Sequence, residues 1–85
     1  MYRLQIKRSA EVDLRRLPNP VFARINQRTI ALRDDPRPVD VRKLQGQQEG
    51  WRIRVGDYRV IYLIDDSDQL ITIVRVRHRR DVYKT

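Results

Sequence analysis

Three strand-like segments in the C-terminal half of the chain constrain its fold most strongly. Apolar and β-branched residues run through 51–55, 58–64 and 70–76, and only short segments rich in Gly, Asp and Ser separate them. Such turns join antiparallel neighbours, so the sequence predicts three consecutive antiparallel strands. A two-residue turn at Gly56-Asp57 places Arg54 opposite Arg59, and a second turn centred near Ser67 places Arg59 opposite Arg77.

Arg54, Arg59 and Arg77 form what we call the arginine row. Directly opposed residues project from the same face of a sheet, and like charges in such positions cost stability. The row therefore suggests an anionic partner, and the guanidinium fork matches the geometry of phosphate groups in a chain such as RNA. Alternatively, these arginines are ordinary solvated strand ends that pair with acidic side chains such as Asp57 or Asp81.

The N-terminal part predicts a strand followed by two helices. Residues 2–7 alternate apolar and polar side chains, as a half-buried strand does. Ser9 is the candidate N-cap of a short helix, which a Pro-Asn-Pro segment ends at 18–20. Asn19 is the candidate N-cap of a second helix, which an Asp-Asp-Pro segment stops at 34–36. The apolar stripe of this second helix consists of Phe22, Ile25, Thr29 and Leu32.

The order of these elements predicts an α+β fold, in which two N-terminal helices pack on one face of a small antiparallel β-sheet. We expect one domain over residues 1–85, with an extended stretch around 41–44. The face toward the helices is expected to carry Trp51, Ile53, Val55, Val60, Tyr62, Ile64, Leu70, Val74 and Val76. The opposite face is expected to carry Arg52, Arg54, Arg59, Ile61, Leu63, Ile71, Ile73, Arg75 and Arg77. Apolar side chains in the middle of this second face need a covering partner.

The composition favours a polyanionic partner. The net charge is +8, and only three of the 19 basic residues are lysines, whereas arginine is the residue favoured for bidentate phosphate contact. Alternatively, the excess charge only keeps a small protein in solution. There are no cysteines, and the longest apolar run, 60–64, is too short to cross a bilayer. We therefore expect a cytoplasmic protein without membrane association.

The basic tail contains two candidate functional residues. His78 directly follows the last strand, among Arg77, Arg79 and Arg80, and imidazole transfers protons near neutral pH. Tyr83 is able to stack on a base or to orient a ribose hydroxyl; alternatively, it anchors the tail in the core. One histidine and scattered carboxylates form no metal-ligand pattern, so we expect neither a metal nor a cofactor.

The order and spacing of three further segments carry a family resemblance. They read KLQG at 43–46, GWRIRVGDYRVIY at 50–62 and VRHRRDVY at 76–83, after the two-helix start. With these segments the chain resembles the RelE/ParE superfamily of toxins from toxin–antitoxin pairs, over nearly its whole length. The family fold is a small antiparallel sheet with two helices packed on it, as the residue patterns predict.

The resemblance implies a ribosome-dependent endoribonuclease that cuts mRNA in the decoding site, where the ribose 2′-hydroxyl attacks the adjacent phosphate. The implied catalytic residues are Arg54, Arg59, Arg77, His78 and Tyr83. The residues that we expect to bind RNA or the ribosome are Arg52, Arg75, Arg79 and Arg80. Some relatives carry lysines where this chain has Arg52 and Arg54. Because arginine is a poor general base, His78 is the better candidate for proton abstraction, as in relatives with a histidine near this place.

The resemblance also implies an antitoxin partner. We expect an acidic or amphipathic antitoxin segment to cover the sheet in a toxin–antitoxin hetero-oligomer, on an apolar strip made of Ile61, Leu63, Ile71 and Ile73. Two other functions stay open. A ParE-like toxin that inhibits DNA gyrase without nuclease activity shares the fold. A non-enzymatic RNA-binding domain would need exposed aromatic residues among the basic ones, and Tyr83 alone is an obvious candidate.

Overall fold

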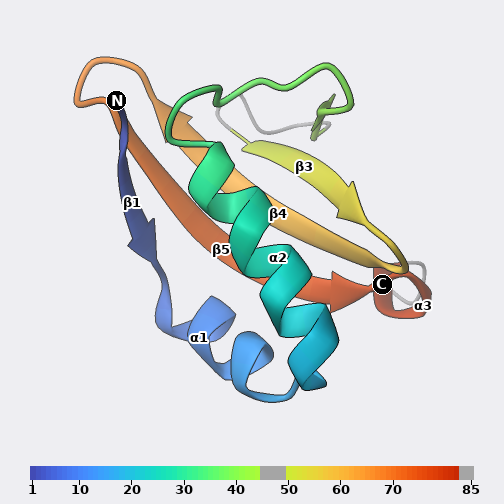
Figure 1. The fold of residues 1–85 in the computed structure, drawn as a ribbon. Coiled ribbons are helices and arrows are strands. Elements are labelled where there is room, and N and C mark those ends of the chain that lie inside the picture. The colour runs from blue at the N-terminus through green and yellow to red at the C-terminus, as the bar shows by residue number, and fades with distance from the viewer. Residues whose placement is uncertain (45–49, 83–85) are drawn as a thin grey trace.

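The computed structural model describes residues 1–44 and 50–82. Along them follow β1 (Arg3–Ile6), α1 (Arg8–Arg15), α2 (Asn19–Ala31), β2 (Arg42–Lys43), β3 (Gly50–Val55), β4 (Tyr58–Asp65), β5 (Leu70–His78) and α3 (Arg79–Val82) (Figure 1). The strands form one sheet in the order β1-β5-β4-β3-β2. The predicted α+β fold is confirmed, and part of the stretch expected to be extended around 41–44 forms β2.

The arginine row forms as predicted. β3 pairs with β4 and β4 pairs with β5, both antiparallel, so that Arg54 lies opposite Arg59 and Arg59 opposite Arg77. Gly56 in the β3–β4 turn has a φ of +60°, a left-handed conformation that glycine adopts without steric cost. β1 is the exception to the antiparallel pattern, because it runs parallel to β5. Its alternating residues identify it as a strand but carry no information about which neighbour it pairs with.

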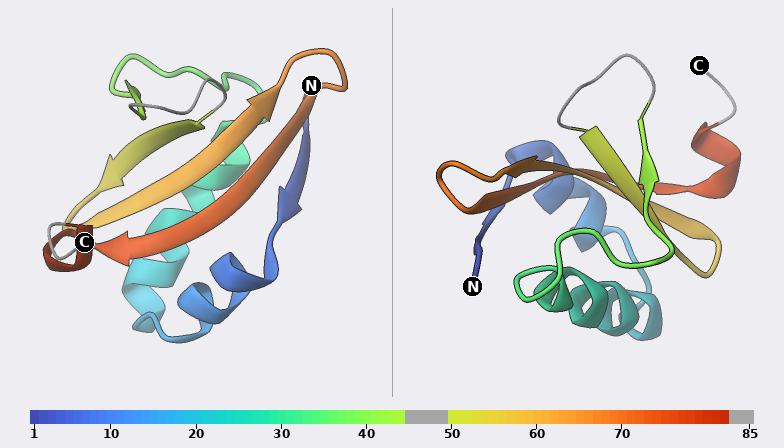
Figure 2. Two further views of the ribbon diagram at one scale, coloured as in Figure 1. Left: turned by 180° about the vertical axis from the view of Figure 1, so that it is seen from behind. Right: turned by 90° about the horizontal axis from the view of Figure 1, so that it is seen from above.

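The helices α1 and α2 cover one face of the sheet (Figure 1). The other face, which we call the open face, carries neither of them, and α3 lies at its end (Figure 2). The buried core between helices and sheet consists of Ala10, Ile25, Leu32, Ile53, Val55, Val60, Tyr62, Ile64, Ile71, Ile73 and Val76. Tyr62 is fully buried, and its hydroxyl donates a hydrogen bond to the carbonyl of Pro36 at 2.7 Å. Burial raises the pKa of Tyr62, so its phenol stays neutral.

A β-bulge interrupts the pairing of β4 with β5. Ile61 lies opposite Arg75, but the next residue, Tyr62, lies opposite Ile73. Val74 is therefore the extra residue of the bulge and has no partner on β4. Because side chains alternate with a period of two, one extra residue exchanges the two faces of β5 on the far side of the bulge.

This bulge makes part of the predicted face assignment wrong. Ile71 and Ile73, expected on the open face, are 0% and 1% exposed in the core. Leu70, expected in the core, is half-buried and shares the open face with Thr72. The apolar strip predicted for an antitoxin therefore loses two of its four members.

The predicted helix starts are wrong in detail. α1 begins at Arg8 with Lys7 at the N-cap position, and α2 begins at Asn19 with Pro18 at that position. Neither helix has a side-chain cap. Instead of capping a helix, Ser9 donates its hydroxyl hydrogen to the carbonyl of Val74 at 2.7 Å.

Ser9 bonds to β5 and does not cap α1, because β1 ends early and leaves backbone groups at the edge of β5 without a neighbouring strand. The N–H of Lys7 donates to the carbonyl of Ile73 at 2.9 Å, and Ser9 bonds the next carbonyl. The carboxylate of Asp13 then accepts the N–H of Val76 at 2.9 Å. The start of α1 thus continues the pairing that β1 begins, as buried backbone groups require.

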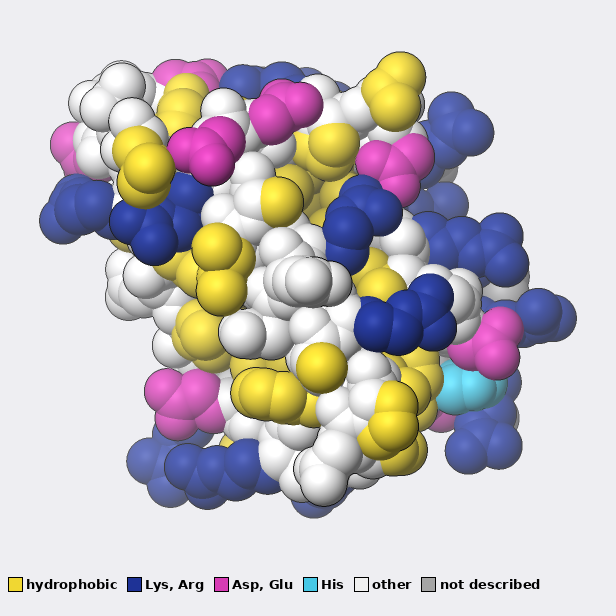
Figure 3. All heavy atoms as spheres, viewed as in Figure 1, with side chains coloured by type: hydrophobic (Ala, Val, Ile, Leu, Met, Phe, Trp, Pro, Cys, Tyr) yellow, Lys and Arg dark blue, Asp and Glu magenta, His cyan; other side chains and the backbone are white. Residues whose placement is uncertain are grey.

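The outer side of α2 carries hydrophobic residues that the core does not use. Phe22 is 42% exposed and Ile30 is 47% exposed, although the sequence predicts Phe22 in the apolar stripe. Ile25, Thr29 and Leu32 are buried as predicted. Figure 3, viewed from the side of α2, shows hydrophobic side chains scattered among polar ones on this face. In the described part of the chain, none of the helices has the length and apolar character to span a membrane.

Candidate nucleic-acid interface

The arginine row lies near the β3–β4 turn. Arg54 is exposed, whereas Arg59 and Arg77 are half-buried. Arg54 donates from Nε to the carbonyl of Gly56 at 3.1 Å, and Arg59 donates from Nη1 to the carbonyl of Tyr58 at 3.5 Å. Among residues 1–44 and 50–82, no carboxylate forms an ion pair with any member of the row. Three positive charges therefore face one another without a counter-charge from the described residues.

A second set of residues is aligned beside the arginine row. Arg42 of β2 lies opposite Arg52 of β3, which lies opposite Ile61 of β4, and Ile61 lies opposite Arg75 of β5. Opposed residues share a face, so these side chains extend the basic surface along the open face. Arg42 and Arg52 make no ion pair with the carboxylates that the structure describes.

Arg75 differs from the other arginines of this face. Its Nε lies 3.1 Å from Asp13 Oδ2, and its Nη2 donates to Asp13 Oδ1 at 3.3 Å. The Nε atom is buried and is not aligned for a hydrogen bond, so the contact at 3.1 Å is electrostatic. The guanidinium of Arg75 holds α1 to β5 and is already engaged, although the sequence predicts a contact with RNA.

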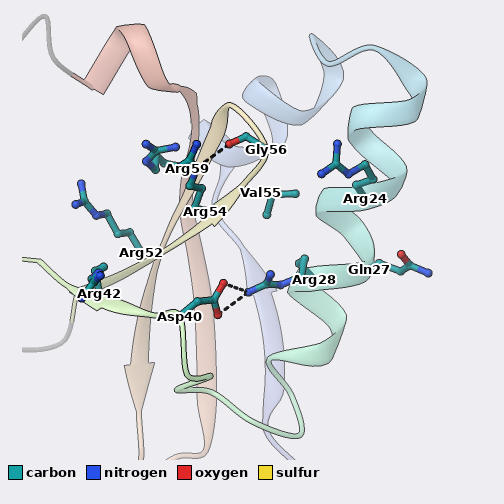
Figure 4. Close-up of a pocket in the computed structure, with 10 residues that line it drawn as sticks. All are labelled: Arg24, Gln27, Arg28, Asp40, Arg42, Arg52, Arg54, Val55, Gly56 and Arg59. Carbon is teal, nitrogen blue, oxygen red and sulfur yellow. Dashed lines mark hydrogen bonds and ion pairs between the residues drawn. The ribbon is translucent and has the colours of Figure 1, made fainter.

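An open groove of about 690 Å³ follows the outer edge of β3 and faces α2 (Figure 4). β2 pairs with only two residues of β3, so the remaining edge of β3 borders the groove. The groove is lined by Arg24, Gln27, Arg28, Asp40, Arg42, Arg52, Arg54, Val55, Gly56 and Arg59. Arg28 donates two hydrogen bonds to Asp40, at 3.0 and 2.8 Å, which links α2 to the segment before β2. These bonds lower the pKa of Asp40.

His78 projects from the opposite face to its neighbour Arg77, although both residues line one open pocket at this end of β5. His78 is directly opposite Tyr58, next to the Arg59–Arg77 pair, and neighbouring pairs project from opposite faces. Its ring packs edge-on against the ring of Tyr58, with centroids 5.1 Å apart. Its Nδ1 accepts the N–H of Arg80 at 3.3 Å. The role of His78 as a proton acceptor for a phosphate on the open face stays a prediction, and this position does not support it.

The short helix α3 is attached to the β3–β4 turn. The N–H of Arg79 donates to the carbonyl of Asp57 at 2.6 Å, and its guanidinium lies 4.0 Å from the Asp57 carboxylate. Arg79 and Arg80 are exposed, as contacts to RNA or the ribosome would require. Tyr83, the remaining predicted catalytic residue, lies outside the described residues.

Sequence reasoning missed Arg24, Arg28 and Arg42, which contribute to the groove. Arg24 and Arg28 are four residues apart on α2, so a basic stripe on one helix face was visible in the sequence. Only the fold could show that this stripe faces the outer edge of β3. Arg42 shared a face with Arg52 only once β2 was paired with β3.

Comparison with known proteins agrees with the fold. A family model described as the ParE toxin of type II toxin–antitoxin systems, parDE, matches residues 4–83. The chain belongs to this toxin family. Toxin RelG of Mycobacterium tuberculosis is 35% identical to this toxin, over 98% of this chain and 97% of its own length. Putative toxin RelE1 of Methanocaldococcus jannaschii is 28% identical, over 98% and 96%.

A solved structure has the same fold as this toxin. The archaeal RelE–RelB complex from Pyrococcus horikoshii contains a chain that matches with a TM-score of 0.82 and 34% identity. The match covers 92% of this chain and 94% of that chain. Together these relatives identify the protein as a RelE-type toxin of the RelE/ParE superfamily.

Proposed function

We propose that this toxin is a ribosome-dependent endoribonuclease that cleaves mRNA in the decoding site and so inhibits translation. The observation that carries the proposal is the arginine row, in which Arg59 has an arginine directly opposite on each side and forms no ion pair with a carboxylate of the described residues. Like charges held together at a cost in stability indicate a site that awaits a multiply charged anion. The phosphate backbone of RNA supplies such an anion.

In the proposed reaction, the ribose 2′-oxygen forms a bond to the adjacent phosphorus and the bond to the 5′-oxygen breaks. The products are a 2′,3′-cyclic phosphate and a 5′-hydroxyl, and the proton lost by the 2′-hydroxyl is balanced by one gained at the 5′-oxygen. The pentacoordinate transition state carries more negative charge than the substrate. Arg54, Arg59 and Arg77 stabilise that charge, which is electrostatic preorganisation. No metal ion or cofactor takes part in the proposal.

The remaining basic residues divide by their contacts. Arg52, Arg79 and Arg80 are the proposed contacts to flanking RNA or ribosomal phosphates, whereas the guanidinium of Arg75 stays with Asp13. Arginine does not lose its proton near neutral pH, so the row stabilises charge and does not accept the proton. Strain that the ribosome imposes on the mRNA supplies part of the remaining rate in this proposal.

The test is cleavage of mRNA in a translation extract, with 5′ ends mapped after brief exposure to the toxin. Arg59→Ala and Arg77→Ala are each expected to abolish cleavage while circular dichroism remains unchanged. Arg8→Ala removes an exposed charge from α1, away from the row, and is the matched control with wild-type cleavage. Retained cleavage in both row variants would refute the assignment of the site. His78→Gln tests proton transfer: a reduced rate with a flatter pH dependence would support a role for His78, and an unchanged profile would remove it from the mechanism.

We also propose that an antitoxin covers the open face. The solved relative from Pyrococcus horikoshii is a complex of RelE with RelB. After correction for the bulge, the apolar residues of the open face are Ile61, Leu63 and Leu70, each half-buried, beside the arginines. An acidic or amphipathic segment fits both parts of this surface. Co-expression with an adjacent small gene product should give a complex, and Leu63→Asp should weaken it while Phe22→Asp on the outer side of α2 should not.

Inhibition of DNA gyrase is the second candidate function, because the matching family model is that of ParE toxins. A gyrase inhibitor has no use for the arginine row as a phosphate site. A supercoiling assay with purified gyrase separates the two functions. Inhibition that survives Arg59→Ala, without mRNA cleavage by the wild-type toxin, would replace the nuclease proposal.

A further inference from the structure

The groove along β3 contains cations beyond those of the arginine row. Arg24 of α2 and Arg42 of β2 line it, together with three arginines of the open face. Asp40 is the one carboxylate among the lining residues that the structure describes, and it is already bound by Arg28 through two hydrogen bonds. In the described parts of the chain, neither Arg24 nor Arg42 has an ion-pair partner. The groove therefore carries a positive charge that its own residues leave uncompensated.

The position of Arg24 connects this groove to the arginine row. A Cβ atom on Gly56 would lie 3.5 Å from both terminal nitrogens of Arg24, so the guanidinium of Arg24 lies directly over the β3–β4 turn. On the same turn, Arg54 donates to the carbonyl of Gly56 at 3.1 Å. One glycine thus stands between a cation from α2 and a cation of the row, and Figure 4 shows both side chains near it.

We infer that the groove binds the sugar–phosphate backbone of RNA outside the phosphate that is cut, with Arg24 and Arg42 as the contacting residues. This inference rests on the proposed function, which places the RNA at the arginine row. From the row, the RNA strand would pass around the end of β3 toward α2. One guanidinium group is able to bind two oxygens of a phosphate, so Arg24 and Arg42, which have no ion-pair partner among the described residues, are each able to hold a phosphate of the strand.

An acidic peptide fits the groove less well. Protein segments that dock in grooves gain most of their affinity from apolar anchors in desolvated pockets. Among the described residues that line the groove, the only aliphatic side chain is that of Val55, which is 7% exposed and belongs to the core. The groove therefore offers charge without an apolar anchor, which is the pattern of a contact to the nucleic-acid backbone.

The RNA comes either from the mRNA or from the ribosome, and two binding assays distinguish these sources. The first measures fluorescence anisotropy of a short 2′-O-methyl oligoribonucleotide, which the toxin cannot cut. The second measures binding to ribosomes programmed with a short mRNA. Both use full-length wild-type toxin, Arg24→Gln, Arg24→Glu, Arg42→Gln and the control Arg8→Gln, across a series of salt concentrations.

We expect Arg24→Gln and Arg42→Gln to weaken binding several-fold and to reduce the slope of log K against log salt by about 0.7 each, the value for one lost contact to single-stranded RNA. Arg24→Glu should weaken binding more, and Arg8→Gln should behave as wild type. Weakening in both assays assigns the groove to mRNA, and weakening only on ribosomes assigns it to ribosomal RNA.

Wild-type affinity and salt slope in both Arg24 variants would overturn the inference. It would also be overturned if these variants lost affinity for a polyglutamate peptide but kept their affinity for RNA. Failure of the proposed function gives a different result: the wild-type toxin does not cleave mRNA on ribosomes, while the dependence of RNA binding on Arg24 persists.

Discussion

Removal of the charge at Arg59 should stabilise the fold while it abolishes the proposed activity. Arg59 is directly opposite Arg54 on one side and Arg77 on the other. Each directly opposed pair on antiparallel strands contributes roughly 0.2–1 kcal/mol, with an unfavourable sign for like charges. Relief of two such pairs by Arg59→Met, which keeps an unbranched side chain over the sheet, is expected to raise the free energy of unfolding by about 1 kcal/mol. For a domain of 85 residues this is a rise in Tm of roughly 4–8 °C.

The assay is urea unfolding, followed by circular dichroism at about 0.01 M and 1 M salt, where the Debye length falls from about 30 Å to about 3 Å. Arg59→Met, Arg77→Met and the double variant form a double-mutant cycle, which separates charge repulsion from packing. Once one charge of a repelling pair is gone, removal of the second brings less gain. At low salt, the double variant should therefore gain less free energy of unfolding than the sum of the gains of the two single variants. At high salt the gains should add.

Two results would refute this reasoning. The first is a cycle with no coupling at low salt, which would mean that the two guanidinium groups do not feel each other. The second is coupling of equal size at both salt concentrations, which would assign it to packing. Arg8→Met on α1 is the control, with an expected change within about 0.5 kcal/mol.

Three further predictions follow from the packing. Asp13→Ala should lower the free energy of unfolding, measured in urea, by about 2 kcal/mol, because it leaves the Val76 N–H and the Arg75 guanidinium without their acceptor. The control Glu11→Ala removes only the exposed ion pair with Arg15 at 3.9 Å and should cost little. Tyr62→Phe should cost about 1 kcal/mol in the same assay, because the carbonyl of Pro36 loses its donor at 2.7 Å, and an unchanged midpoint would mean that water replaces it. The third prediction concerns acid unfolding. Hydrogen bonds from Arg28 lower the pKa of Asp40, and hydrogen bonds from Arg37 and Tyr2 lower the pKa of Asp66. Both carboxylates therefore stabilise the fold above their unfolded pKa of about 3.9, and this stabilisation is lost as the pH falls through their lowered folded pKa values. Unfolding measured between about pH 5 and 2 should show a smaller acid loss in Arg28→Gln than in the wild type, and an equal loss would contradict the role of Asp40.

Much of this toxin could be read from local patterns. The two-residue turn at Gly56-Asp57 fixed the register of β3 and β4, because a turn that short permits few pairings. The predicted pairing of Arg59 with Arg77 is also correct, but for a different reason. The register assumed for the second turn was wrong by one residue, and the extra residue of the bulge cancels that error at this end of β5. The membership in a toxin family was likewise visible in the order of the segments along the chain.

Other features depended on contacts between distant parts of the chain. Ser9 is a suitable helix cap by residue type, yet its hydroxyl donates a hydrogen bond to the carbonyl of Val74 on the edge of β5. It does so because β1 is too short to pair with that part of β5. His78 follows Arg77 directly, but neighbours on a strand project from opposite faces, so only the fold shows which groups surround each of them. Arg24 joined the candidate interface only when α2 packed beside β3.

The sequence by itself determined which segments are the long strands of the sheet and which arginines oppose one another near the β3–β4 turn. These properties follow from side-chain periodicity and turn chemistry, which act over a few residues. The tertiary structure decided which face of β5 is buried and which cations share the groove beside α2. Those properties depend on a single extra residue at Val74 and on helix packing, because one bulge exchanges the faces of a strand and packing alone brings distant residues together.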